Sequence, residues 1–257
     1  GKTRPAAMAI ATLLRISAAA IASSRAATSM GASRLRAPVA SKMVRMATTM
    51  PDVSKYMAPA PADAPAFTMQ QTMIRVKDPE RALDFYTKAL GMQLIWHKDF
   101  AEYGFSVYFC AYYSGPVPES EDERFRLCMT TPGCIELTWN HGSEALAEGK
   151  VYNTGNADTT GVPEGKPVKG GFGHLGVTCP DVYAACARLK ELGVEFHKSP
   201  NSGGMKGLAF VRDPDGYLVE ILPQGYDPAT GHMPTQAVDC CGVELDAGGG
   251  YADNSKQ

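Results

Sequence analysis

The chain repeats one pattern of residues in its two halves, and this repeat restricts its fold more than any other feature. In each half, a polar residue that can bind a metal opens an apolar strand, and a glutamate lies inside a later apolar strand. The residues are Gln71 and Glu136 in the first half and His174 and Glu220 in the second. One imidazole, two carboxylates and one amide oxygen suit a divalent cation. The pattern therefore predicts two related modules and a metal centre.

The repeat extends beyond these four residues. When Gln71 is aligned with His174, Asp78 falls on Asp181, and each aspartate closes a strand and opens a helix. Apolar side chains then recur at the helical period in both halves, and each helix stops at a glycine that can supply a left-handed end. The matched segments are helices over 79–90 and 182–192, glycines Gly91 and Gly193, and strands over 92–96 and 194–197. The predicted fold class is α+β, with paired βαβββ modules produced by internal duplication.

Both glutamates lie between apolar neighbours in their strands. Burying such a carboxylate costs several kcal/mol unless it is paired or bound to a metal. A single strand glutamate can equally point outward to water. Two glutamates at equivalent positions, Glu136 and Glu220, favour a role as ligands.

Strand geometry places further polar groups beside the predicted ligands, because residues two apart in a strand share a face. The two sets are Gln71, Met73 and Arg75, and Glu136, Thr138 and Asn140. Arg75 and Asn140 each lie four residues from a ligand, a separation of about 13 Å along a strand. That separation suits a contact with the anionic end of an extended small substrate.

Turn and loop signals complete the modules. The segment Asp213-Pro214-Asp215-Gly216 is a strong turn signal between strands expected over 209–212 and 217–222, so Glu220 lies on the returning arm of a hairpin. The other expected elements are a strand over 105–112 and loops over 114–123 and 153–171.

Composition divides the chain into six segments. Residues 1–51 contain eight basic residues and no acidic one and are rich in Ala and Ser, as in an organelle transit peptide. The predicted segments are a disordered transit peptide at 1–50, a linker at 51–66, the first module at 67–150, a connecting loop at 151–171, the second module at 172–225 and a disordered tail at 226–257. We therefore expect a mitochondrial or plastid location after removal of the peptide, with the cytoplasm as the alternative.

Charge and hydropathy exclude two classes of partner. Without the eight N-terminal basic residues, 17 basic residues face 27 acidic ones, a net charge of −10. Nucleic acid is therefore an unfavourable partner, and no apolar run is long enough to span a bilayer. The seven cysteines are odd in number and form no CxxC pair, which favours free thiols. Two of them, Cys240 and Cys241, lie in the expected disordered tail.

Between residues 70 and 222 the chain resembles glyoxalase I (lactoylglutathione lyase), a family of the vicinal oxygen chelate superfamily. The resemblance rests on several short motifs spread over both modules. The matching segments are 71–79, 83–86, 90–92, 135–138, 171–176, 205–210 and 213–217.

The resemblance implies a reaction and an assembly. It implies a homodimer with active sites at the subunit interface, and one metal bound by Gln71, Glu136, His174 and Glu220. It implies isomerisation of the hemithioacetal of methylglyoxal and glutathione, the co-substrate, into S-lactoylglutathione. Glu220 would be the principal catalytic base, with Glu136 its counterpart across the metal.

The resemblance also implies substrate contacts. The matching positions are Arg75, Asn140, Lys169, Gly170, His174, Lys198, Gly204 and Met205, with an apolar pocket at Phe100, Phe105, Phe109 and Met129. One position departs from the family, which commonly has an arginine where this chain has Gly170. Lys169 beside it could supply the charge, but an ammonium cannot make the bidentate contact of a guanidinium. Glutamine as the first ligand resembles the zinc-using branch of the family, so zinc is expected, with nickel as the alternative.

Three other functions fit parts of the pattern. A dioxygenase or epimerase of the same superfamily is one, although a two-histidine iron site would need histidine in place of Gln71. A fosfomycin-type transferase would lack the segment around Met205. A metal-free module that binds a small molecule is the third, and metal content would exclude it.

Overall fold

The computed structural model describes residues 52–147, 149, 151–155, 171–227 and 229–246. Contacts divide the chain into residues 1–62 and 63–257. In the described part of the first unit, a short 3-10 helix, η1 (Ser54–Tyr56), follows Asp52, whose carboxylate accepts hydrogen bonds from the backbone nitrogen and hydroxyl of Ser54. The predicted transit peptide lies outside the described residues. No helix in the described ranges is long and apolar enough to cross a membrane.

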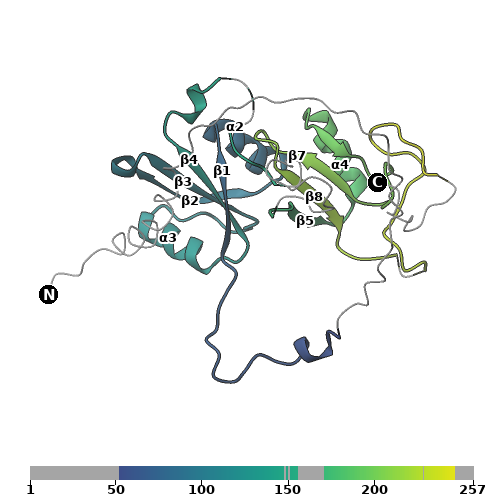
Figure 1. Ribbon diagram of the computed structural model, residues 1–257, viewed down its shortest axis with the longest axis horizontal. Coiled ribbons are helices and arrows are strands. Elements are labelled where there is room, and N and C mark those ends of the chain that lie inside the picture. Colours follow the sequence, from purple (N-terminus) through teal and green to yellow (C-terminus); the bar gives the residue numbers. More distant parts are fainter. Residues whose placement is uncertain (1–51, 148, 150, 156–170, 228, 247–257) are drawn as a thin grey trace, which may run out of the picture. The chain divides into compact units, whose positions relative to one another are not determined.

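The first module is a four-stranded sheet with three helical segments (Figure 1). Its main elements are β1 (Gln71–Val76), α2 (Pro79–Leu83), the π-helix η2 (Asp84–Ala89), β2 (Gln93–Phe100), β3 (Phe105–Ala111), α3 (Glu121–Thr130) and β4 (Cys134–Asn140), with short 3-10 turns η3 (Ala101–Tyr103) and η4 (Ser143–Ala145). The strand order is β1-β4-β3-β2, with β1 and β4 parallel and the other pairs antiparallel. Asp78 starts the helix, since its carboxylate accepts hydrogen bonds from the backbone of Glu80 and Arg81.

The second module repeats this order in a second sheet. Its elements are β5 (Leu175–Cys179), α4 (Val182–Glu191), β6 (Phe196–Lys198), β7 (Ala209–Arg212) and β8 (Leu218–Pro223), in the order β5-β8-β7-β6. Asp181 caps α4 as Asp78 caps α2, and Gly91 and Gly193 follow the two helices with φ of 79° and 75°. The matching strand order confirms the predicted duplication and the α+β fold class.

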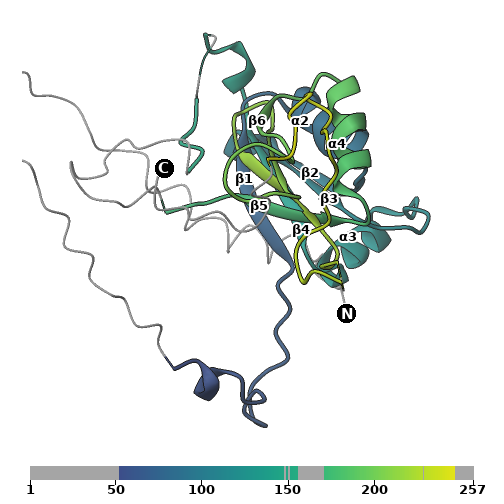
Figure 2. The same cartoon turned by 90° about the vertical axis from the view of Figure 1, so that its right-hand side faces the viewer.

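One hydrophobic core runs through both modules. It includes side chains from the strands and helices of both modules, and Figure 2 gives a second view of these elements. Arg188 on α4 donates hydrogen bonds of 2.5 Å to the carbonyl oxygens of Lys88 and Ala89 at the end of η2. The buried Tyr86 hydroxyl donates to Asp213 Oδ2 at 3.0 Å, which joins the first module to the turn between β7 and β8. The modules thus share apolar packing and specific polar contacts.

The structure differs from the sequence prediction at α3. The expected loop over 114–123 is wrong from Glu121 onward, where a helix begins. Three acidic residues occupy its first turn, where negative charge interacts favourably with the helix N-terminus. Phe125 anchors the helix on β2, with its ring centroid 5.1 Å from that of Trp96. A polar segment becomes helical here because tertiary packing supplies what its own pattern lacks.

The segment after Tyr226 also differs from the expected disorder. Residues 229–246, which we call the C-terminal strap, follow a defined path and include a β-bridge between Val238 and Glu244. Asp239 is buried within the strap and bonds to the backbone of Asn201 in the second module. A few long-range hydrogen bonds therefore order a segment whose composition favours disorder.

Candidate metal centre and active site

The first pair of predicted ligands lies on neighbouring parallel strands. The register of β1 and β4 places Met73 opposite Glu136, and the Gln71 side-chain amide donates a hydrogen bond to Glu136 Oε2. Thr138, on the same face, donates to Glu136 Oε1 at 3.3 Å. The contact between Gln71 and Glu136 places an amide and a carboxylate side by side.

Glu136 is a buried carboxylate with a raised pKa. The residue is only 4% exposed. Burial raises its pKa above the ordinary glutamate value, and hydrogen bonds from Thr138 and Gln71 and the charge of Arg75 lower it in part. The neighbouring groups therefore compensate incompletely for lost hydration. A buried oxygen donor of this kind fits a bound cation, which would favour the charged form.

The second pair lies at the equivalent place in the second module. His174 directly precedes β5, and its Nε2 lies 3.0 Å from Glu220 Oε2 on β8. The two side chains are 35% and 15% exposed, respectively. The Phe210 ring packs edge-on against the imidazole at 5.1 Å, and Gly176 lies opposite Glu220 across the sheet. The histidine and the carboxylate thus present a nitrogen and an oxygen donor from a partly open face.

The single chain holds these ligands as two separate pairs. Glu136 does not join His174 and Glu220 in a group of three ligand atoms that all lie within 4.8 Å of one another; over the described ranges, only Asp239, Cys240 and Cys241 form such a group. Gln71 and His174 nevertheless line one cavity of about 480 Å³ between the modules. Each pair supplies half of the donor set that a four-coordinate divalent metal needs.

Aromatic side chains share the face of Glu136. Phe109 lies directly opposite Glu136 in the register of β3 and β4, and Phe105 lies opposite Asn140. The Phe100 and Phe105 rings stack at 5.1 Å, and Met129 on α3 is partly exposed. The predicted apolar positions on β2 and β3 therefore lie beside the first pair of ligands.

The structure adds residues that the sequence did not identify. Trp96 packs on Phe109 at 5.4 Å and on Phe125 of α3, so α3 and Trp96 cover part of the ligand face. Asn140 donates a hydrogen bond of 3.1 Å to the Tyr152 hydroxyl, at the start of the connecting loop. Strand alternation could have identified Trp96, whereas no local signal identifies Phe125 or Tyr152.

Lys198 occupies the edge of the second ligand face. It pairs with Phe210, which pairs in turn with Glu220, so Lys198 lies two strands from the carboxylate, about 10 Å away. Its ammonium donates to the carbonyl oxygens of Leu208 at 2.7 Å and Ser199 at 3.2 Å. Burial, and then the nearby charge of Lys206, lower the pKa of Lys198 to about 8.

The remaining predicted contacts fall into two groups. Gly204 and Met205 are partly exposed in the loop between β6 and β7. Lys169 and Gly170 lie outside the described residues. The structure therefore places Lys198, Gly204 and Met205 at one edge of the second sheet.

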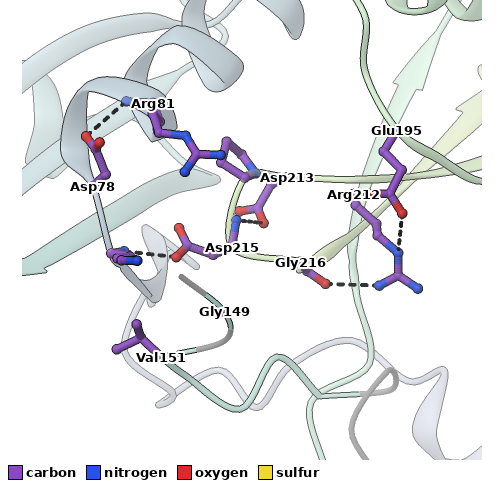
Figure 3. Close-up of a pocket in the computed structure, with 11 residues that line it drawn as sticks. Asp78, Arg81, Gly149, Val151, Glu195, Arg212, Asp213, Asp215 and Gly216 are labelled. Carbon is purple, nitrogen blue, oxygen red and sulfur yellow. Dashed lines mark hydrogen bonds and ion pairs between the residues drawn. The ribbon is translucent and has the colours of Figure 1, made fainter. Parts of the chain in front are cut away.

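A second cavity, of about 460 Å³, lies at the junction of the modules (Figure 3). Two of its charged groups have partners: Asp215 accepts a hydrogen bond from the Lys77 nitrogen, and Arg212 pairs with Glu195 at 3.2 Å. Burial, and then the charge of Asp215, raise the pKa of Asp213 to about 7. None of the predicted metal ligands lines this cavity, so we assign it a role in joining the modules.

Comparison with known proteins identifies the family. The description "Glyoxalase/Bleomycin resistance protein/Dioxygenase superfamily" matches residues 68–221. The chain belongs to this superfamily. Among its superfamily relatives, a lactoylglutathione lyase of Pseudomonas putida is 43% identical over 175 residues, which cover 68% of this chain and 93% of that protein. A lactoylglutathione lyase of Pseudomonas aeruginosa is 45% identical over 157 residues, covering 61% and 82%.

Other superfamily members are longer or more distant. The lactoylglutathione lyase of Schizosaccharomyces pombe is 38% identical over 63% of this chain, and the match covers 49% of that protein. A solved structure of the trypanothione-dependent glyoxalase I of Leishmania major is 28% identical, with a TM-score of 0.41, over 62% of this chain and 88% of that one. The names of the three lactoylglutathione lyases confirm the resemblance to glyoxalase I within the superfamily.

Proposed function

We propose that this chain is a lactoylglutathione lyase, which converts the hemithioacetal of methylglyoxal and glutathione into S-lactoylglutathione. The observation that carries the proposal is the occurrence of two contact pairs, Gln71 with Glu136 and His174 with Glu220, at equivalent places in two duplicated modules. The names of the Pseudomonas relatives, which align over most of their own length, support the same reaction.

The four side chains of these pairs would hold one divalent metal. Such an ion, when bound, polarises substrate oxygens and makes the adjacent carbon more acidic. Zinc is our choice over nickel, because imidazole, carboxylate and amide donors suit it and because the ligand pattern resembles the zinc-using branch of the family.

Glu220 is the proposed base. Its carboxylate is partly open to the face that would receive the substrate, and His174 holds it at 3.0 Å. In the reaction, Glu220 removes the proton from the substrate carbon that carries sulfur and returns it to the neighbouring carbon. Glu136 is its counterpart from the other module. The carbon-bound proton passes to the adjacent carbon and the hydroxyl proton to the adjacent oxygen, so the reaction is an isomerisation and needs no external oxidant or reductant.

Other side chains would orient the substrate. Arg75 and Asn140 lie on the ligand face of the first module, and we assign them to the carboxylate and amide groups of glutathione. Lys198 and the loop with Gly204 and Met205 would bind from the second module, and Lys169 beside Gly170 would add charge. The aromatic group around Phe109 would receive the apolar part of the substrate and exclude water.

We further propose that the enzyme is a homodimer whose active sites lie at the subunit interface. The support is the separation of the ligands: the described single chain does not gather Glu136, His174 and Glu220 around one point. A two-fold axis would bring the first pair of one copy to the second pair of the other, and would do so twice.

For location, we propose an organelle, with the N-terminal segment acting as a transit peptide. Its support is the composition of residues 1–51, which hold eight basic residues and no acidic one. Determining the N-terminus of the mature protein tests this, since a cleaved peptide predicts a start near residue 50.

The activity test measures S-lactoylglutathione formation by ultraviolet absorbance from methylglyoxal and glutathione. The proposal predicts activity that a chelator abolishes and zinc restores. Protein that binds metal but leaves the hemithioacetal unchanged would contradict it and favour another reaction of the superfamily, and protein that binds no metal would favour a binding module.

A further inference from the structure

The buried residue Asn201 connects the C-terminal strap to the loop between β6 and β7 through hydrogen bonds. The Asn201 backbone nitrogen donates to Asp239 Oδ2 at 2.9 Å. Its side-chain nitrogen donates to the carbonyl oxygens of Gln236 at 3.0 Å and Val243 at 2.9 Å. Asn201 is 0% exposed. Its Oδ1 accepts a 2.6 Å hydrogen bond from the Tyr183 hydroxyl on α4, so strap, loop and helix meet at this residue.

The two carboxylate oxygens of Asp239 accept hydrogen bonds from different segments of the chain. Oδ1 accepts hydrogen bonds from the backbone nitrogens of Cys241 at 2.8 Å and Val243 at 3.0 Å, and so shapes the turn of the strap itself. Oδ2 accepts from Asn201 and so holds the loop. One carboxylate therefore connects the conformation of the strap to the position of the loop.

The loop approaches the strap too closely for any side chain at Gly207. This residue has a φ of +82°, and an added Cβ would lie 2.7 Å from the carbonyl oxygen of Pro234 and 2.8 Å from Cβ of Met233. Beside it, Lys206 donates to the carbonyl oxygen of Asn201 at 2.6 Å and pairs with Asp246 at 3.1 Å. Contacts along the whole loop therefore depend on the strap.

This loop is directly connected to the second pair of ligands. It begins after Lys198, whose ammonium bonds to the Leu208 carbonyl oxygen at the other end of the loop. The next strand carries Phe210, which packs on His174 and lies opposite Glu220. A displaced loop would move Lys198 and the residues around Met205 while leaving the paired strands of the sheet in place.

We propose that the C-terminal strap is a positioning element: through Asp239 and Asn201 it holds the loop over 199–207 in the orientation that receives the thiol-bearing peptide part of the substrate. This inference rests on the proposed function. Asn201 and Asp239 are positioning residues, since they act through the loop. The strap thereby sets substrate affinity, whereas Glu220 carries the chemical step.

Asp239→Asn is a selective test. The amide oxygen can still accept from Cys241 and Val243, but the amide nitrogen then faces the Asn201 N–H, so a hydrogen bond is replaced by two opposed donors. Asp227→Asn is the matched control: Asp227 accepts from the Ala229 nitrogen near the start of the strap, and its recorded hydrogen bonds lie within 227–232. Gly207→Ala perturbs a second contact between the loop and the strap, where Gly207 approaches Met233 and Pro234.

Steady-state kinetics on the metal-loaded full chain give the readout. For Asp239→Asn and Gly207→Ala we expect KM for the hemithioacetal to rise about tenfold, as for the loss of one hydrogen bond to a charged group, with kcat within about twofold. Asp227→Asn keeps the native KM. The double substitution in strap and loop has less than the summed effect, because both release the same loop from the strap.

The outcomes separate this inference from the proposed function. If the protein is active and its KM is the same as in wild type with Asp239→Asn and with Gly207→Ala, the proposed role of the strap is refuted and the proposed function is not affected. A fall in kcat with KM unchanged would also refute this role, since that places the strap in the chemical step. Unsubstituted protein without activity would overturn the proposed function, and this inference with it. If Asp239→Asn fails to fold, Gly207→Ala still decides the question.

Discussion

Asp213 offers a quantitative test of how the modules are joined. Its carboxyl group is 4% exposed and lies in the turn between β7 and β8 (Figure 3). Oδ2 accepts from the Tyr86 hydroxyl of the first module, and Oδ1 accepts from the nitrogens of Asp215 at 3.0 Å and Tyr217 at 2.8 Å. Asparagine can keep these contacts, because Oδ1 stays an acceptor and the tyrosine hydroxyl can accept from the new amide. Asp213→Asn therefore removes the titration and preserves the packing.

The sign and size of the effect follow from the pKa. Burial raises the folded-state pKa of Asp213 to about 7, whereas an unfolded aspartate titrates near pH 3.9. Between these values the folded chain binds a proton that the unfolded chain has lost, so the free energy of unfolding falls as pH rises. Each pH unit contributes about 1.4 kcal/mol. From pH 5 to pH 8 the wild type therefore loses about 2.6 kcal/mol that Asp213→Asn keeps, because the loss levels off above the folded-state pKa.

Urea denaturation at pH 5 and pH 8 measures this effect. The difference in the free energy of unfolding between wild type and Asp213→Asn, taken at each pH, removes the contribution of all other titrating groups. Asp84→Asn is the control, since Asp84 is exposed and only pairs with Lys88 on the same helix; its difference from wild type should stay within about 0.5 kcal/mol at both pH values. Equal pH dependence in wild type and Asp213→Asn would refute the account of the junction.

Three further predictions concern the ligands and their surroundings. Glu220→Gln should lower kcat at least about 100-fold, the usual contribution of a catalytic base, in single-turnover assays of metal-saturated protein; a loss below tenfold would exclude Glu220 as the base. KM should rise above pH 8 as Lys198 loses its proton, because burial lowers the pKa of Lys198 to about 8. In a kinetic pH series, Lys198→Arg should make KM independent of pH between 7 and 10. Phe109→Ala should lower the free energy of unfolding by about 3 kcal/mol in urea, since this aromatic side chain is buried against Trp96; a change below about 1 kcal/mol would contradict that packing.

Local signals predicted the duplicated framework well. Asp78 and Asp181 start helices, Gly91 and Gly193 follow them with positive φ, and strand alternation placed Glu136 and Thr138 on one face. Each of these depends on residues close in sequence, where propensity and periodicity are informative. The repeat also marked the four residues that form the two contact pairs, although not their division into pairs.

The sequence could not predict features that depend on distant residues. The α3 segment looks polar, and its packing depends on Trp96, which lies 29 positions before Phe125. The strap is ordered by Asn201, 38 positions before Asp239. The separation of the ligands into two pairs depends on how the modules pack. Such contacts are set by tertiary structure, which local patterns do not encode.

The central claim is that the two contact pairs are halves of one catalytic metal centre, completed by a second copy of the chain. Complementation tests it most directly: Glu136→Gln and Glu220→Gln proteins are unfolded together, refolded with zinc and assayed for S-lactoylglutathione formation. Random pairing gives one intact site in each mixed dimer, so the mixture should recover about a quarter of wild-type activity. A mixture no more active than the separate variants would contradict the claim.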